Sequence, residues 1–192
     1  YDFSSFSGMH TCVFAQLMMN PDLDVETLMR DFFIRNYPVA GETIADYYCS
    51  LIKRWEEKAL SVPYYGGIDE KLKAYLDEKE FENFYNEITQ LKNKADEEEA
   101  YNLRRLITTF SFTRLEIARH RGHRDFGFAK LDGNVMRVKG DVYEWLKIFE
   151  DGYKAYELFD ITESGDKSAD YVASWKKYLL KDKSVKSLLF GK

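Results

Sequence analysis

Apolar side chains recur at helical spacing along almost the whole of this 192-residue chain. In the stretch 20–38 the recurring positions are Val25, Leu28, Met29, Phe32 and Phe33. Residues spaced by three and four positions lie on one face of an α-helix. Asp24 is a suitable N-cap for this helix, and Pro21 and Pro38 bound it on either side. The pattern therefore predicts a well-bounded amphipathic helix.

The same spacing predicts further helices and an all-α fold. Helical patterns cover 41–60, 68–98, 98–120, 141–159 and 169–180, and the apolar run 9–19 is expected as a buried helix. Residues 121–140 are rich in glycine and lack helical period, so we expect one irregular loop or a short hairpin there. The expected architecture is an antiparallel array of six or seven helices packed side by side.

Charge excludes some classes of function. The chain has 28 Lys and Arg against 33 Asp and Glu, a net charge of −5, and its basic residues form no stripe. A nucleic-acid footprint requires such a stripe, so we expect no nucleic-acid partner. No apolar run reaches the roughly 20 residues of a membrane span, so none is expected. The sequence opens on YDFSSF without an initiator Met, and we expect it to be a segment of a longer protein.

Few residues carry recognisable chemistry. His120 and His123 lie three apart and precede Asp125, a conceivable zinc-ligand set, although basic side chains at a helix end also complement the helix dipole. Glu163 lies in a turn among aromatic helices and is a candidate acid or base. The acidic run 96–100 is interpreted as the solvated first turn of a helix. We predict no metal and no cofactor, and assign no catalytic residue.

Aromatic residues and thiols give two further expectations. Tyr64 and Tyr65 lie in a loop with Pro63 and two glycines, where they are candidates for stacking on carbohydrate, with burial of one ring as the alternative. Cys12 and Cys49 are the only cysteines. Buried free thiols are expected, and a disulfide between them stays open if the protein is exported.

The order of these elements supports a family resemblance. Residues 15–48, AQLMMNPDLDVETLMRDFFIRNYPVAGETIADYY, contain an apolar helix that ends near Asn-Pro, a DVxxLxxDF helix and a long helix with a Tyr pair. This order resembles the C-terminal helical region of an uncharacterised Bacteroidetes family of carbohydrate-degradation proteins. Residues 102–121 resemble the family's later helix, and 161–166 resemble a recurring turn. One departure is Pro38, which stands where the family has a glycine-containing turn.

The resemblance implies a domain organisation and a location. In that family the helical region follows a (β/α)8 barrel resembling the α-glucuronidases. Residues 1–19 are then expected to be the last helix of an upstream barrel, and 20–192 a helical C-terminal domain. The parent protein is expected to be a glycoside hydrolase with its catalytic carboxylates in the barrel. Its location is expected to be periplasmic, outer-membrane-associated or secreted.

Three hypotheses for function follow. The first is a non-catalytic accessory domain that supports the barrel and contributes to a homodimer, which predicts an apolar surface on residues 1–19. The second is an independent carbohydrate- or protein-binding module, with polysaccharide as a partner and an exposed aromatic strip. The third is a helical enzyme with a site at Glu163 or at His120 and His123.

Overall fold

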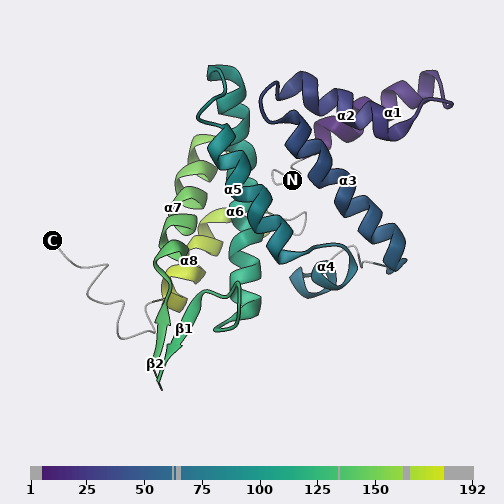
Figure 1. Cartoon of the computed structure of the whole chain (residues 1–192). Coiled ribbons are helices and arrows are strands. Elements are labelled where there is room, and N and C mark those ends of the chain that lie inside the picture. Colours follow the sequence, from purple (N-terminus) through teal and green to yellow (C-terminus); the bar gives the residue numbers. More distant parts are fainter. Residues whose placement is uncertain (1–5, 62, 64–65, 134, 162–164, 180–192) are drawn as a thin grey trace. The chain divides into compact units, whose positions relative to one another are not determined.

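The computed structural model describes residues 6–61, 63, 66–133, 135–161 and 165–179. Within these residues, 6–107 form one compact unit, the N-terminal unit, and 108–179 form a second, the C-terminal unit. Eight helices and one two-stranded sheet occur in the described part of the chain (Figure 1). The all-α prediction is confirmed, and the count is one helix higher than expected.

The N-terminal unit begins with three helices joined by short turns. They are α1 (Ser7–Met19), α2 (Val25–Asn36) and α3 (Gly41–Lys58). Asp24 caps α2 as predicted, because its carboxylate accepts a hydrogen bond from the Thr27 backbone N–H at 2.8 Å. At Gly41 an added Cβ would lie 2.6 Å from the Ile34 Cα, so only glycine allows α3 to begin this close to α2.

The predicted helix over 68–98 is divided into two. The helices are α4 (Ile68–Ala74) and α5 (Glu78–Leu91), and the division falls at Asp77. The Asp77 carboxylate accepts a hydrogen bond from the Glu80 N–H at 2.8 Å and so caps α5. The long helix α6 (Glu97–Arg121) follows Asp96, whose carboxylate caps it by accepting a hydrogen bond from the Glu99 N–H at 2.8 Å. Residues 97–107 of α6 belong to the N-terminal unit and 108–121 to the C-terminal unit.

The core of the N-terminal unit is formed by one apolar face from each of several helices. Its large fully buried side chains are Met9, Phe33, Ile44, Phe81, Ile88 and Leu103. Tyr47 of α3 stacks on Phe84 of α5, with ring centroids 3.9 Å apart and an interplanar angle of 7°. This stacked pair fixes how α3 and α5 pack against each other.

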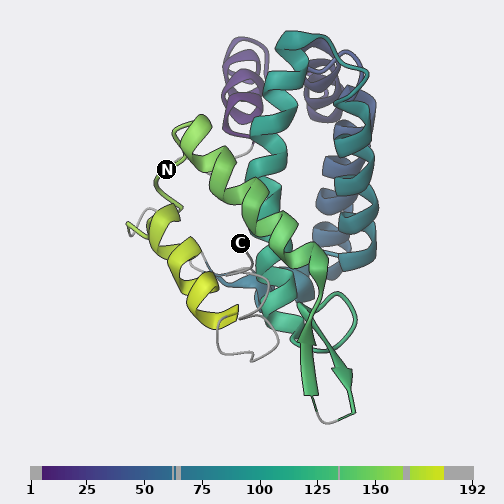
Figure 2. The same cartoon turned by 90° about the vertical axis from the view of Figure 1, so that its left-hand side faces the viewer.

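The C-terminal unit contains the short hairpin expected near 121–140. Strand β1 (Ala129–Asp132) pairs antiparallel with β2 (Val135–Val138), and Ala129 lies opposite Val138. Helices α7 (Gly140–Ala155) and α8 (Ser168–Leu179) follow. Figures 1 and 2 show α7 alongside the C-terminal half of α6, and α8 packs on α7. Trp175 and Phe149 are the largest fully buried side chains in the core of this unit.

Candidate functional site

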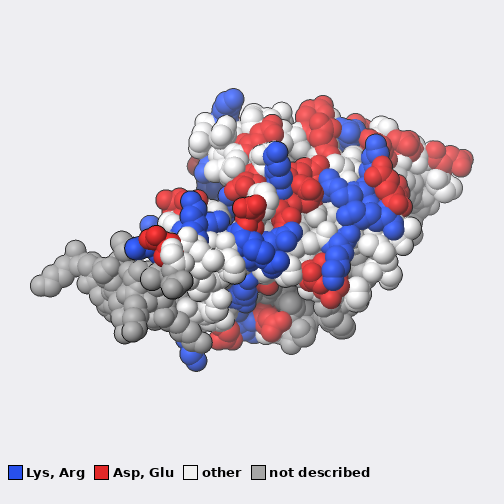
Figure 3. Space-filling view, turned by 60° about the horizontal axis from the view of Figure 1, so that its bottom comes forward, with Lys and Arg blue, Asp and Glu red and all other residues white. Residues whose placement is uncertain are grey.

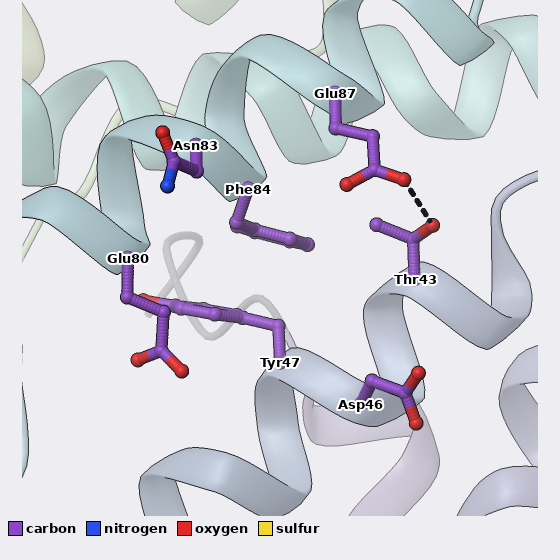
Figure 4. A pocket seen from close by; sticks show the side chains of 7 residues that line it. All are labelled: Thr43, Asp46, Tyr47, Glu80, Asn83, Phe84 and Glu87. Carbon is purple, nitrogen blue, oxygen red and sulfur yellow. Dashed lines mark hydrogen bonds between the residues drawn. The ribbon is translucent and has the colours of Figure 1, made fainter.

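A hollow of about 260 Å³ lies between α3 and α5 in the N-terminal unit (Figure 4). It is lined by Thr43, Asp46, Tyr47, Glu80, Asn83, Phe84 and Glu87. Burial raises the pKa of Tyr47, because the phenolate is disfavoured where little water reaches it. The Tyr47 and Phe84 rings are both buried, so neither ring of this hollow offers an open face for stacking on a sugar.

Each carboxylate that lines the hollow already has a partner within the chain. The Asp46 carboxylate accepts from Arg30 Nη1 at 2.7 Å, and Glu80 forms an ion pair with Arg54. Thr43 Oγ1 donates to Glu87 Oε1 at 3.0 Å, as Figure 4 shows. These contacts join α3 to α2 and α5. The hollow is therefore a place where helices are held together by polar contacts.

The structure does not bring the sequence-predicted candidates together. His120 is half-buried in the last turn of α6, and His123 is exposed in the turn beyond it. Gly122 adopts a φ of +64° between them, which ends the helix. The described residues contain no group of three or more His, Cys, Asp and Glu side chains arranged to hold a metal ion. Tyr64, Tyr65 and Glu163 lie outside the described residues.

Two further predictions concern burial. Cys12 and Cys49 are free thiols, and both are half-buried rather than buried.

The acidic run 96–100 is not wholly solvated, because Glu99 is only 3% exposed. Its Oε1 accepts hydrogen bonds from the backbone N–H groups of Val39 at 2.9 Å and Ala40 at 3.0 Å. Glu99 therefore supplies the capping acceptor that Ala40, at the start of α3, lacks.

The most exposed apolar surface of the N-terminal unit lies on α1. Phe14, Met18 and Met19 are 68%, 87% and 90% exposed. The prediction that this helix is buried is wrong for these three side chains, and the exposed apolar surface expected of an accessory domain is present. The sequence of α1, SGMHTCVFAQLMM, contains no Asp, Glu, Lys or Arg. We call Phe14, Met18 and Met19 the α1 face.

The opposite side of α1 explains why this face points outward. Met9 and Val13 are buried, and the Phe6 ring just before the helix lies 5.4 Å from the Phe33 ring and 5.0 Å from the Tyr48 ring. The Tyr48 hydroxyl also hydrogen-bonds His10 Nε2 at 2.7 Å. These contacts fix the rotation of α1 about its axis. The α1 face is consequently turned away from α2 and α3.

On the face of the molecule that Figure 3 shows, Lys and Arg are interspersed with Asp and Glu, without a continuous stripe of one sign. No helix among the described residues is both long and apolar enough to cross a membrane.

Comparison of the chain with protein-family models, with curated proteins and with solved structures gives no match in any of the three.

Proposed function

We propose that the chain is a non-catalytic helical accessory domain of a polysaccharide-degrading, glycoside-hydrolase-like protein, and that it docks on the barrel of that protein through the α1 face. The observation that carries the proposal is the exposure of Phe14, Met18 and Met19 on a helix without charged residues. Soluble domains rarely leave clustered large apolar side chains in water without a partner surface. Covering each of these side chains would contribute about 1.5–3 kcal/mol.

The polar groups of the N-terminal unit support an accessory role. General acid and base catalysis of glycoside hydrolysis requires two carboxyl groups that can reach the substrate. In the hollow between α3 and α5, Asp46, Glu80 and Glu87 instead bind Arg30, Arg54 and Thr43. Their arrangement serves the packing of helices. The resemblance that suggests the barrel also suggests a homodimer and a periplasmic, outer-membrane-associated or secreted location.

The proposal predicts binding between this chain and the polypeptide encoded immediately before it. With the two parts produced separately, calorimetry is expected to show saturable binding with a Kd of about 1 µM or tighter. Phe14→Ser, Met18→Gln and Met19→Gln together are expected to weaken this binding by a factor of at least about 100, which corresponds to about 2.7 kcal/mol or more. Circular dichroism checks that the variant keeps its helix content.

A matched control removes exposed apolar side chains elsewhere. Leu131 and Met136 are exposed and lie opposite each other in the hairpin, so Leu131→Gln with Met136→Gln is expected to leave the affinity unchanged. Equal affinity for the α1-face variant and the unmodified chain would contradict the proposal. Glycan binding by the chain alone that is lost in Trp55→Ala would favour the independent carbohydrate-binding module, because Trp55 is an aromatic residue that is 49% exposed.

A further inference from the structure

The acidic link between α1 and α2 adjoins the α1 face. Residues 20–26 read NPDLDVE and alternate apolar with acidic side chains, and Leu23 and Val25 are exposed. Residues 6–29 contain three acidic side chains, Asp22, Asp24 and Glu26, and no Lys or Arg. An uncharged apolar surface therefore ends in a segment that is only negative.

The negative charge of this segment is only partly neutralised within the chain. Asp24 caps α2, and hydrogen bonds from the Thr27 hydroxyl and backbone N–H lower the pKa of the Asp24 carboxyl, which keeps it ionised. Glu26 pairs with Arg30 at 3.0 Å, but Arg30 is shared with Asp46 at 2.7 Å. Asp22 makes no ion pair within the part of the chain that the structure describes. A partner that covers the α1 face would meet this charge at one end.

We infer that the α1 face and the segment 22–26 form one docking surface for an amphipathic helix of a partner protein, with Lys or Arg at the end of that helix that meets Asp22 and Asp24. This inference rests on the proposed docking function and adds the chemistry of the partner. Charge complementarity favours such a partner, because the acidic segment attracts a basic group and repels a like charge.

A helix is the element that this surface fits. Phe14 and Met18 are separated by one helical turn, so they form a ridge into whose neighbouring grooves the side chains of another helix can pack. The unbranched Met18 and Met19 side chains adapt to irregular apolar partners. The outer ring of a (β/α)8 barrel consists of helices, so the proposed partner presents this kind of element.

Two other occupants fit the charges less well. A second copy of the chain would bring to this surface a segment that also lacks Lys and Arg before Arg30. An anionic membrane surface attracts basic segments and repels acidic ones. The experiments below also detect binding of a second copy and binding to a membrane.

Three model peptides test the inference on the complete chain. Each is a helix of about 18 residues, long enough to form with a leucine stripe. The first carries three Lys at one end, the second has Glu at those positions, and the third is a scrambled form of the first. Fluorescence anisotropy is expected to show binding of the Lys peptide about 10-fold tighter than of the Glu peptide. The difference is expected to disappear at about 1 M salt, where the Debye length is about 3 Å.

Two variants separate the charge contribution from the apolar contribution. Asp22→Asn with Asp24→Asn is expected to weaken binding of the Lys peptide to the level of the Glu peptide, and asparagine still caps α2. Glu97→Gln with Glu98→Gln neutralises two exposed carboxylates on α6 and is expected to change nothing. The α1-face variant is expected to lose both peptides.

The outcomes distinguish this inference from the docking function. Equal binding of the Lys and Glu peptides, lost in the α1-face variant, would overturn the inference about charge and leave docking supported. Absence of peptide binding up to about 1 mM would overturn the inference. The docking function itself is tested separately, by the calorimetric titration with the preceding polypeptide. Binding to vesicles that contain anionic phosphatidylserine, without peptide binding, would also overturn the inference. A concentration-dependent dimer, measured by light scattering and abolished in the α1-face variant, would do the same.

Discussion

Trp175→Ala is expected to lower the free energy of unfolding of the C-terminal unit by about 3–5 kcal/mol. The Trp175 side chain is fully buried and is the largest fully buried side chain in this part of the chain. Its ring meets the Phe128 and Tyr178 rings edge-on, with centroids 6.2 Å and 6.0 Å away. The Arg119 guanidinium lies 4.7 Å above it, a cation–π contact that contributes about 0.5–2 kcal/mol more. Truncation leaves a cavity beneath all of these groups.

Hydrogen exchange and urea unfolding measure this effect. Loss of amide protection is expected to be largest over 108–179, the residues that form the C-terminal unit with Trp175. Trp55→Ala is the matched control, because the half-exposed Trp55 makes one hydrogen bond, to the Leu60 carbonyl at 2.9 Å, and its loss is expected to cost about 1 kcal/mol. Equal destabilisation by the two substitutions would contradict the assignment of Trp175 to the core.

Glu99→Ala is expected to destabilise the chain by about 2–4 kcal/mol, because two backbone N–H groups at the start of α3 lose their acceptor. Val39 and Ala40 donate to the Glu99 carboxylate, and Ala40 is fully buried, so water cannot replace the lost contact there. The negative charge also lies at the positive end of the α3 dipole. Glu99→Gln keeps one acceptor oxygen without the charge and is expected to cost about half as much.

Glu98→Ala is the control for this prediction. Glu98 lies in the same first turn of α6 but is exposed, so its removal is expected to cost only about 0.3–1 kcal/mol through the helix dipole. Urea unfolding followed by circular dichroism compares the two free energies. If Glu98→Ala and Glu99→Ala had the same effect, the buried capping role of Glu99 would be excluded.

The comparison of Glu98 and Glu99 shows what the sequence can and cannot predict. The helices and the Asp24 cap follow from local spacing and local hydrogen bonds, and they were predictable. The Asp77 cap is also a local feature, but it was not predicted, because 68–98 contains many charged residues among which one capping Asp is hard to recognise. By contrast, the role of Glu99 depends on residues 39 and 40, which are 60 and 59 positions away in the sequence.

The same limit applies to the candidate site. The sequence identifies 9–19 as an uncharged apolar helix, but apolar composition alone does not say which side is covered. That depends on Met9 and Val13 packing into the core, which turns Phe14, Met18 and Met19 toward solvent. His120 and His123 were close in sequence, yet Gly122 ends the helix between them. Two histidines that are close in the sequence therefore do not form a metal site in the described structure.

The most direct test of the proposed docking is a hydrogen-exchange footprint of the chain with and without the barrel of the proposed parent protein. The account predicts slower exchange in α1, centred on 14–19, and in the link 20–26, with the hollow between α3 and α5 unchanged. Full saturation of the complex with unchanged exchange in 14–26, or with protection confined to α3 and α5, would contradict it.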